Sequence, residues 1–512
     1  MKNISYLDMV KEILNESEFF EFEKCYNNPV KKSIKILNHR GYKSKKSDLH
    51  DIVQSILSQE RDLSEPNFSY NWNKYNDVLF ATRKENLKSA SLWSHYLHQA
   101  WLIYVQEMAA SLSVQMLGVE EWDYVLDMCA APWGKSIQIA EALLSSWTKW
   151  RILSDTQDSS SQAPQNDDNV WFLISNEIDQ WRKKALESNL HRCGIFNVWV
   201  INQDWCIIWD NFPETFDKVL VDAPCSWEWM QYKSDKKVRQ RDEKKSKKLS
   251  DLQIQLLISW LKALKVWGEL VYSTCTTNVL ENEYVVSEVL KQYWDKIELL
   301  PVPLDEKSDW ITIWHWNEIL SPKNAKKVAR LWPHVHWTGG FFIAKFRKIQ
   351  SFWTEWNEVK NLRHNTQDSS AKASEWQIWE KLSTWWISPI PDLDFFISKY
   401  TVNIAPKSLI QSHFENKINI EIWLPIFKIL EDKKNNSQKL IPLVWIAQIF
   451  GHLATQNVLE INDEQLNLLM EKRDLNDERL KDYEWNFVIL RWNWMGVWLV
   501  SVQKWIWKNK CF

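Results

Sequence analysis

Short apolar runs that alternate with helix-length segments constrain the fold of this chain more than any other feature. Strands are predicted at 124–127, 170–175, 198–202, 218–222 and 269–273, and helices at 136–144, 179–193 and 252–265. Strands and helices that alternate at this spacing form doubly wound, mostly parallel sheets. The sequence therefore predicts an α/β fold with a Rossmann-like sheet.

The remaining segments differ from this pattern in composition. A basic, strand-like stretch at 31–40 lies in an N-terminal part that otherwise reads as mostly helical, and a Ser-, Gln-, Asn- and Asp-rich stretch at 154–169 reads as an insertion. The C-terminal part ends in strand-like runs at 486–490 and 495–502. The predicted divisions are an accessory segment at 1–110, the sheet domain at 111–348, a linker at 349–386 and a compact α/β domain at 387–512.

The loop after the first strand has the place of a ligand-binding loop. In doubly wound sheets a nucleotide-like ligand binds at the carboxyl ends of the strands, where small residues let backbone N–H groups approach it. Trp133 does not suit such a loop, because an indole occupies the space of the ligand. The candidate ligand-binding residues here are Cys129, Ala130, Ala131, Pro132, Trp133, Gly134 and Lys135.

Two carboxylates follow the next two strands. Glu177 stands where an acid takes both ribose hydroxyls, and Asp204 stands where a carboxylate faces an adenine amino group. A single acid at such a place is as often a turn residue or a helix cap. Acids in register after successive strands favour an adenosine-containing ligand.

Cys225 and Cys275 follow the fourth and fifth strands, in turns rich in Pro, Ser and Thr. A thiolate is a strong nucleophile when nearby cations or helix N-termini lower its pKa. Buried cysteines are commonly inert, and that interpretation suits Cys193 and Cys206. The sequence therefore places two candidate nucleophiles at the edge of the sheet that carries the ligand loop.

Three motifs in this order resemble the Nop/Sun-type RNA cytosine methyltransferases, which make 5-methylcytosine with S-adenosylmethionine. They are Asp127-Met-Cys-Ala-Ala-Pro-Trp-Gly-Lys135, Asp222-Ala-Pro-Cys225-Ser and Tyr272-Ser-Thr-Cys275-Thr. The resemblance covers about residues 25–348, and the C-terminal segment more weakly resembles the PUA-like RNA-binding domain of the RsmF/RsmB-type branch. A plain dinucleotide-binding oxidoreductase fits less well, because the loop lacks the G-x-G-x-x-G spacing.

The resemblance implies a role for each site residue. It assigns residues 129–135, Glu177, Asp204 and Asp222 to S-adenosylmethionine and the adjoining catalytic centre. Cys275 is then the nucleophile that adds to carbon-6 of cytosine, and Cys225 helps to release the product. Lys135 and Asp222 also hold the target base, and no metal is implied.

The resemblance implies an RNA substrate, with small-subunit ribosomal RNA expected. Transfer RNA is the alternative substrate, and a catalytically inactive RNA-binding or ribosome-assembly protein is the alternative class. The net charge of −3 excludes a strongly basic nucleic-acid wrapper, but 233–248 holds nine Lys or Arg against three acids. We interpret this stretch as a mobile loop that contacts RNA phosphates, or else as a solvated charged loop.

No signal peptide is expected, because residues 1–24 are acidic and polar and lack a charged start followed by an apolar stretch. No membrane span is expected, because the longest apolar run, near 441–450, is shorter than the roughly 20 residues that a bilayer requires. The seven scattered cysteines suit a reducing compartment. We therefore expect a cytoplasmic protein, and we expect it to be a monomer.

The chain departs from the family pattern by having Trp where the pattern has Gly. It holds 9 Gly and 36 Trp, and the surplus Trp includes Trp133, Trp227, Trp229 and Trp267. Further examples are Trp93, Trp101, Trp122 and Trp205. One interpretation is a genuinely Trp-rich protein with a blocked cofactor loop. Our hypothesis is that UGA codons, read as glycine by a bacterial lineage, are written here as tryptophan, and that some Trp, such as Trp332, are genuine.

Overall fold

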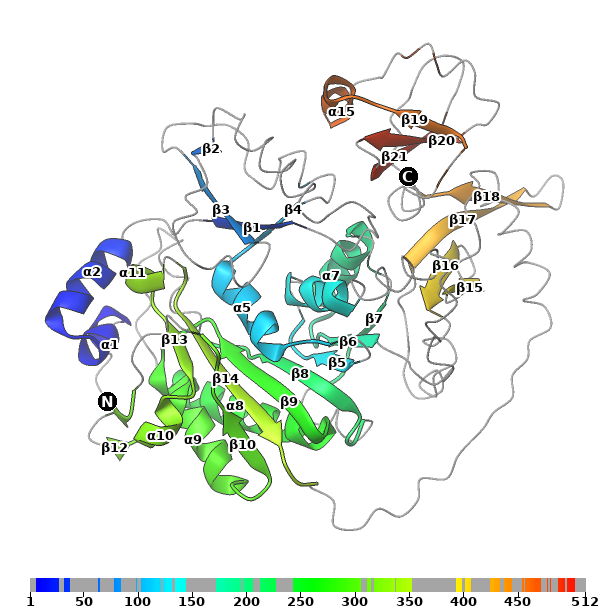
Figure 1. The fold of residues 1–512 in the computed structure, drawn as a ribbon. Coiled ribbons are helices and arrows are strands. Elements are labelled where there is room, and N and C mark those ends of the chain that lie inside the picture. Colours follow the sequence, from blue (N-terminus) through cyan, green and yellow to red (C-terminus); the bar gives the residue numbers. More distant parts are fainter. Residues whose placement is uncertain are drawn as a thin grey trace, which may run out of the picture.

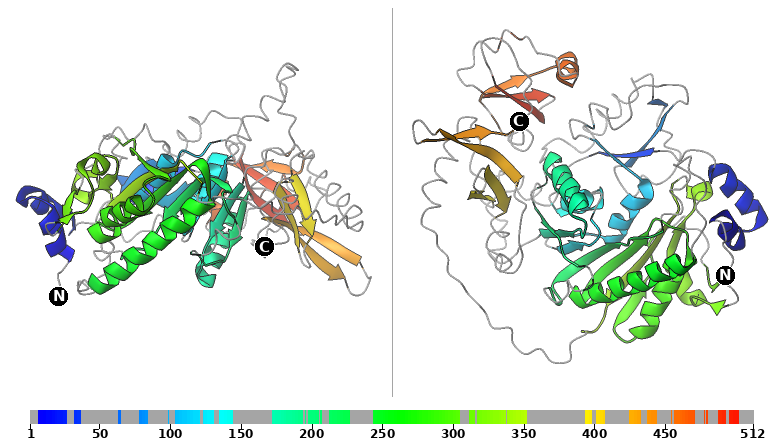
Figure 2. Two further views of the ribbon diagram at one scale, coloured as in Figure 1. Left: turned by 90° about the horizontal axis from the view of Figure 1, so that it is seen from below. Right: turned by 180° about the vertical axis from the view of Figure 1, so that it is seen from behind.

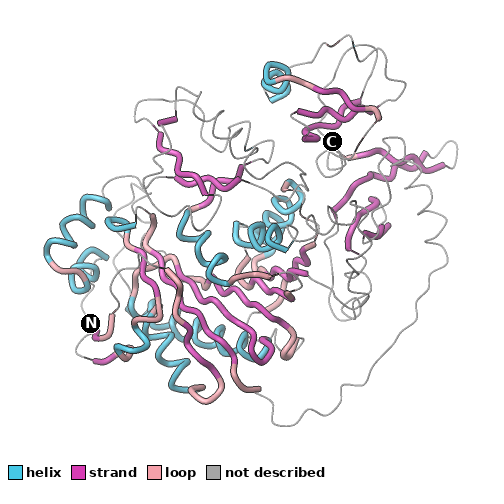
Figure 3. Tube along the Cα trace, viewed as in Figure 1, coloured by secondary structure: helices cyan, strands magenta, loops and turns pink. Residues whose placement is uncertain are grey.

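The computed structural model of the chain describes its central part most fully. The structure describes most of residues 103–143, 172–226 and 243–351. The gaps within these ranges are 121–122, 131–133, 194, 196, 205, 207–211, 305–310, 315–316 and 337. Residues 6–26 are also described, together with separate strands and short helical pieces in the remaining chain (Figure 3). The predicted insertion at 154–169 and nearly all of the predicted linker lie outside these residues.

An eight-stranded sheet forms the centre of the molecule (Figure 1). Its order is β10–β14–β9–β8–β5–β6–β7, and β13 pairs with β14. The bounds are β5 (Tyr124–Asp127), β6 (Phe172–Asn176), β7 (Val198–Ile201), β8 (Phe216–Asp222), β9 (Leu264–Thr274), β10 (Ile297–Leu300), β13 (Ala329–Leu331) and β14 (Phe341–Lys348). Strands β5 to β9 pair in parallel, whereas β14 is antiparallel to β9, β10 and β13. The strand order reverses at β5, which is where such sheets bind ligands.

Helices cover both faces of the sheet, because successive strand residues point to opposite sides. Val125 packs into one apolar cluster with α5 (Met108–Leu117) and α7 (Gln180–Arg192), while Leu126 packs into another with α8 (Glu243–Ala263) and α9 (Glu283–Gln292). Figure 1 shows α5 in front of the sheet, and the rear view in Figure 2 shows α8 in front of it. The predicted doubly wound α/β sheet is confirmed.

Local sequence explains where several helices begin and end. Asp179 caps α7 by accepting from the backbone N–H of Arg182 at 2.8 Å. Gly118 ends α5 with φ 63°, a left-handed conformation in which a glycine avoids the clash of a side chain. Trp267 lies within β9 with φ 71° and is 68% exposed, and this conformation is strained for a bulky residue.

The N-terminal segment differs from the mostly helical prediction. Its described residues form α1 (Tyr6–Ile13) and α2 (Glu16–Tyr26) and a four-stranded antiparallel sheet, β2–β3–β1–β4. These strands are β1 (Lys32–Ile36), β2 (Leu63–Ser64), β3 (Val78–Arg83) and β4 (Ile103–Gln106). The strand-like stretch predicted at 31–40 is confirmed as β1. Tertiary pairing explains the other strands, because they complete their hydrogen bonds with partners far along the chain.

The helix pair α1–α2 packs beside the short helix α11 (Pro333–His336) (Figure 1). Phe22 meets Trp332 edge-on, with ring centroids 5.8 Å apart. Both belong to an apolar cluster that also contains Val279, from the 3₁₀ helix η5 (Val279–Glu281) that follows the Cys275 turn.

Two small sheets are described near the C-terminus. One has the order β15 (Leu393–Ile397), β16 (Thr401–Pro406), β17 (Leu424–Asp432) and β18 (Ser437–Pro442). The other joins β19 (Val458–Glu460), β20 (Phe487–Trp492) and β21 (Met495–Ser501), and α15 (Asp463–Met470) follows β19. The strand-like runs predicted at 486–490 and 495–502 are therefore confirmed, within one or two residues.

Two boundaries near the site were predicted wrongly. Helix α8 begins at Glu243, so 243–248, interpreted from the sequence as part of a loop, form its first turns. Lysine and glutamate are good helix formers, which explains why this charged stretch continues the helix. Strand β9 begins at Leu264 and not near 269, because α8 ends directly at Ala263. Residues 233–242 lie outside the described part.

Candidate active site

The loop after β5 is anchored to both neighbouring strands. The N–H of Met128 donates to the carbonyl of Leu220 at 3.1 Å, and the N–H of Ala130 donates to the carbonyl of Asn176, also at 3.1 Å. Residues 131–133, including Ala131, Pro132 and Trp133, lie outside the described residues, and a helix at 134–143 follows. The anchored loop therefore starts at the sheet edge where a ligand was predicted.

Close packing against β4 explains why a glycine, Gly134, stands at the start of that helix. A Cβ at this position would lie 3.2 Å from atoms of the Gln106 side chain and of the Tyr104 ring. Such contacts are tighter than ordinary van der Waals packing. The close approach of β4 therefore adds a second reason for glycine here, beside the predicted approach of a ligand.

The ends of β6 and β7 are joined by amide side chains. Asn176 and Gln203 form two hydrogen bonds, in which the Asn176 side chain donates to the Gln203 carbonyl at 3.1 Å and accepts from its N–H at 2.9 Å. The Asn202 side chain donates to the carbonyl of Glu177 at 2.6 Å. Glu177 and Asp204 are thereby held at one edge of the sheet, as the sequence predicted.

The two acids differ in burial. Glu177 is fully buried, accepts from the N–H of Asp179 at 3.0 Å and has Arg182 3.6 Å from its other oxygen. Asp204 is exposed and accepts from the N–H of Cys206 at 2.9 Å, a local turn contact. Only Glu177 therefore has the buried setting expected of a residue that selects a ligand group.

Asp127, the last residue of β5, is a polar residue that the sequence did not single out as a site residue. It is fully buried, and its Oδ2 accepts from the Ser136 hydroxyl at 2.6 Å. Its Oδ1 has no hydrogen-bond partner among the described residues. Burial raises the pKa of Asp127 to about 7, although the Ser136 hydrogen bond and Lys135 lower it.

Lys135 and Asp222 form an ion pair beside this loop. The ammonium lies 2.5 Å from Oδ2 of Asp222, and the Ser273 hydroxyl donates to Oδ1 at 2.9 Å. Burial disfavours the charge of Lys135, but attraction and hydrogen bonding from Asp222, together with nearby Cys275, raise the pKa of Lys135. The ammonium also lies 5.7 Å from the centre of the Phe341 ring. A fixed positive charge therefore faces the cysteine turns.

Cys225 and Cys275 are brought together as predicted. Strands β8 and β9 are parallel neighbours, and the N–H of Ala223 donates to the Ser273 carbonyl at 2.9 Å just before the chains diverge. The two Sγ atoms lie 3.0 Å apart, and both side chains are partly exposed. Two thiols thus share one small volume at the carboxyl edge of the sheet.

The other cysteines in the described part have different settings. Burial raises the pKa of Cys129 well above its ordinary value, and Asp222 and Asp127 raise it further. Cys193 is fully buried at the end of α7, a setting that agrees with an inert core thiol. Cys206 is partly exposed, and burial followed by the charge of Asp204 raises its pKa. A raised pKa keeps the Cys129 and Cys206 thiols protonated and poorly nucleophilic.

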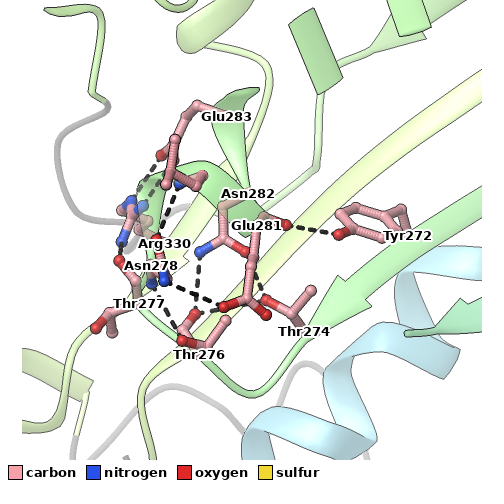
Figure 4. Close-up of polar contacts among 10 residues, drawn as sticks. Tyr272, Thr274, Thr276, Thr277, Asn278, Glu281, Asn282, Glu283 and Arg330 are labelled. Atoms are coloured by element: carbon pink, nitrogen blue, oxygen red, sulfur yellow. Dashed lines mark hydrogen bonds and ion pairs between the residues drawn. The ribbon is translucent and has the colours of Figure 1, made fainter. Parts of the chain in front are cut away.

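A buried polar network supports the cysteine turns (Figure 4). Glu281, Asn282 and Glu283 follow the Cys275 turn, and all three are fully buried. Arg330, from β13, donates to both oxygens of Glu283 at 2.6 Å and to the Thr277 carbonyl at 2.9 Å. This network could not be predicted from the sequence, because Arg330 lies 47 residues from Glu283 along the chain.

The basic candidates for RNA contact are only partly described. Lys244, Lys245, Lys247 and Lys248 lie exposed on the first turns of α8. Lys247 donates to the Tyr284 hydroxyl at 2.8 Å and pairs with Asp251 at 3.1 Å. Within the part of the chain that the structure describes, no cluster of three metal-ligating side chains occurs. None of the helices in that part has both the length and the apolar character needed to cross a membrane.

Residues 165–347 match the family model of the 16S rRNA methyltransferases RsmB/F. The matched stretch contains Glu177, Asp222, Cys225 and Cys275, and it begins after the loop at 127–135. The family match therefore covers the strands that carry the two cysteines and the supporting network.

Two curated proteins show the extent of the likeness. Ribosomal RNA small subunit methyltransferase F of Photobacterium profundum is 28% identical over 348 residues, which are 67% of this chain and 63% of that protein. The human 28S rRNA (cytosine(4447)-C(5))-methyltransferase is 31% identical over 254 residues, 48% of this chain and 27% of that protein. The chain thus spans less than two thirds of the length of these relatives.

A solved structure described as the crystal structure of PH0851 superimposes with a TM-score of 0.50 at 24% identity. The superposition covers 67% of this chain and 65% of that one. This likeness agrees with the α/β fold described above.

Proposed function

We propose that the chain is an S-adenosylmethionine-dependent RNA cytosine-5 methyltransferase. The observation that carries the proposal is the pair of thiols, Cys225 and Cys275, with Sγ atoms 3.0 Å apart beside the Lys135–Asp222 ion pair. Two adjacent thiols suit a reaction that needs one sulfur to form a bond to the substrate and another to assist its release. The match of 165–347 to rRNA methyltransferases supports the same activity.

The residues around β5 and β6 fit S-adenosylmethionine. The cofactor supplies a methyl group on a positively charged sulfur. Glu177 is a buried acceptor for the ribose hydroxyls, and Asp127 has a buried oxygen without a hydrogen-bond partner among the described residues. Buried polar groups of this kind are normally satisfied, so a cationic, hydroxyl-bearing ligand suits them. Residues 129–135 and Asp204 complete the proposed cofactor set.

Cys275 acts as the nucleophile in this proposal. Its thiolate adds to carbon-6 of cytosine, which makes carbon-5 electron-rich enough to take the methyl group. A water molecule then takes the proton from carbon-5. The electrons of that C–H bond re-form the carbon-5–carbon-6 double bond as the carbon-6–sulfur bond breaks and the Cys275 thiolate leaves. Lys135 faces the same turns with its ammonium, which stabilises negative charge on sulfur and on the base.

Cys225 assists the last step, because its sulfur lies 3.0 Å from the Cys275 sulfur. Asp222 selects the base. Its carboxylate accepts from the exocyclic amino group of cytosine, whereas uracil presents an oxygen at that place. An acceptor for which uracil offers no donor discriminates against uracil. The target base must leave its stack to reach these groups.

Cysteine variants test the chemistry. Cys275→Ala is expected to abolish methyl transfer, and Cys225→Ala is expected to accumulate a covalent protein–RNA adduct on denaturing gels. Transfer of radiolabelled methyl groups to RNA measures the first effect. Methylation that persists in Cys275→Ala would refute the assigned nucleophile.

Small-subunit ribosomal RNA is the proposed substrate, because the first relative is named a small subunit methyltransferase. Exposed lysines on the first turns of α8, together with 233–242, are proposed to contact RNA phosphates. Bisulfite sequencing of ribosomal and transfer RNA, with and without the gene, identifies the target. A lost site in transfer RNA would favour that substrate, and no lost site would favour an inactive RNA-binding protein.

We also propose that much of the surplus Trp stands for Gly. Trp267, predicted to replace Gly, has φ 71° and an exposed side chain, which suits glycine. Trp332, predicted to be genuine, is buried against Phe22. The other family Gly positions, including Trp133, Trp205, Trp227 and Trp229, lie outside the described residues. Peptide mass spectrometry of the native protein decides between the two residues, and tryptophan at all these positions would refute the proposal.

The segments around the sheet domain are proposed to bind RNA. The small sheets at either end of the chain support accessory units at 1–110 and 387–512, and the first packs against 111–348 through Phe22 and Trp332. The linker at 349–386 leads to the second. The PUA-like character of the last unit is part of this proposal, and truncation at 386 tests it through RNA affinity. The monomeric state and the cytoplasmic location stay predictions, which light scattering and cell fractionation test.

A further inference from the structure

Glu281 stands where the two cysteine turns meet. One carboxylate oxygen, Oε2, accepts from the backbone N–H of Ser226 at 2.9 Å, in the residue after Cys225. The other, Oε1, accepts from the Asn278 side chain at 3.1 Å, three residues after Cys275. Glu281 is fully buried, so these hydrogen bonds form in a region from which water is excluded.

The Cys225 turn has further ties to the same point. Gln253, on α8, donates to the carbonyl of Pro224 at 2.9 Å and to Oε2 of Glu281 at 3.2 Å. The Ser226 hydroxyl lies 3.1 Å from the Thr276 hydroxyl. The turn that carries Cys225 is therefore held to α8 and to the Cys275 turn, with Glu281 as the shared acceptor.

The Cys275 turn is fixed separately on its other side (Figure 4). The Asn282 side chain donates to the Thr276 carbonyl at 3.0 Å and accepts from the Thr274 hydroxyl at 2.6 Å. The Tyr272 hydroxyl donates to the Glu281 carbonyl at 2.6 Å. The backbone around Glu281 is thus rigid, and its side chain reaches from this rigid turn to the Cys225 turn.

We propose that Glu281 is a positioning residue that holds Cys225 at its distance from Cys275, and that Gln253 assists it. The effect of Glu281 on product release rests on the proposed function, whereas its positioning of the two thiols does not. Glu281 acts through the backbone of Ser226 and not on the base itself. It therefore governs the step that needs both sulfurs, the elimination of the Cys275 adduct. A displacement of about 1 Å in such a geometry costs on the order of a hundredfold in rate.

Glu281→Gln is the sharpest variant, because it keeps the size of the side chain. Donors approach both carboxylate oxygens, so the glutamine NH₂ group would face a donor on one side. Gln253→Met is the second variant, which removes the assisting donor and leaves Glu281 in place. Glu288→Gln, at a partly exposed site on α9, controls for loss of charge. Val289→Ala, in the core beneath α9, controls for general destabilisation.

The first measurement needs no RNA. In glutathione redox buffers, the Cys225 and Cys275 thiols exchange with oxidised glutathione to give one protein disulfide and two reduced glutathione molecules. The equilibrium constant, followed by mass spectrometry of the linked peptides, reports how closely the sulfurs are held. Glu281→Gln is expected to lower this equilibrium constant at least fivefold, and Gln253→Met is expected to lower it as well. Glu288→Gln and Val289→Ala are expected to stay within twofold of the parent. A fall of less than fivefold in Glu281→Gln overturns the proposal.

The second measurement uses methyl transfer. Glu281→Gln is expected to accumulate the covalent RNA adduct that Cys225→Ala accumulates, with the affinity for S-adenosylmethionine changed less than twofold. The double variant, Glu281→Gln with Cys225→Ala, is expected to accumulate no more adduct than Cys225→Ala alone, because both changes act on one step. Independent, multiplying effects would overturn the proposal. If the parent chain transfers no methyl group, the proposed function fails, while the redox equilibrium still decides whether Glu281 positions the thiols.

Discussion

The buried ion pair between Arg330 and Glu283 gives the most sharply defined prediction about stability. Both side chains are at most 1% exposed, and two hydrogen bonds of 2.6 Å join them. Arg330→Met removes the cation and leaves the Glu283 carboxylate buried without it. Breaking a buried pair from one side costs about 3–5 kcal/mol, so we expect a loss of this size in the free energy of unfolding.

A double variant separates the charge from the packing. Arg330→Met with Glu283→Leu replaces the pair by apolar groups, and such replacements are commonly neutral or stabilising. Most of the lost stability is therefore expected to return. Arg347→Met is the matched control, because Arg347 is 37% exposed where it meets Glu269, and surface pairs contribute about 0–1 kcal/mol.

Urea denaturation followed by circular dichroism measures all of these variants. The m-value should stay constant if only stability changes. The reasoning fails if Arg330→Met loses less than about 1 kcal/mol, or if the double variant is no more stable than Arg330→Met. The Thr277 carbonyl also loses its donor in both variants, so a part of the loss is expected to remain.

Three further predictions concern the site and the strand beside it. Burial raises the pKa of Asp127 to about 7, so the carboxylate that attracts a cationic cofactor forms as the pH rises. The affinity for S-adenosylmethionine, measured by calorimetry, should therefore increase about tenfold between about pH 6 and about pH 8. Asp127→Asn should flatten this pH dependence. Lys135→Met should lower the rate of methyl transfer at least tenfold, because the ammonium faces the cysteine turns. An unchanged single-turnover rate would contradict this. In a chain with tryptophan at 267, Trp267→Gly should raise the free energy of unfolding by about 1 kcal/mol, because φ 71° is strained for a side chain; a loss of stability by thermal denaturation would contradict it.

The sheet could be predicted because its strands are short buried runs between helices. The end of β5 at Asp127 and the capping of α7 by Asp179 follow from local sequence. The start of α8 at Glu243 was missed, because solvated lysines suit both a loop and a helix. Of the N-terminal sheet, only the strand-like stretch at 31–40 was predicted, and it forms β1. The other strands were missed because they depend on partners distant along the chain.

The site residues were predicted because polar residues at the ends of parallel strands meet at one edge. This reasoning brought Cys225, Cys275, Asp222 and Lys135 together correctly. It could not find Glu281 or Arg330, whose partners lie 55 and 47 residues away. Nor could it find the raised pKa of Asp127, which comes from complete burial and not from the type of residue.

The two sulfurs follow adjacent parallel strands, and this has a consequence for how the molecule can diverge. The hydrogen-bond ladder between β8 and β9 continues to the contact between Ala223 and Ser273. The distance between the two cysteine turns is therefore set by the separation of neighbouring strands, about 4.8 Å. This strand separation is set by backbone hydrogen bonds and does not depend on which side chains surround it. The loops that are proposed to meet RNA can therefore change in length and charge, and so change the nucleotide that is accepted, while the two thiols keep the same separation.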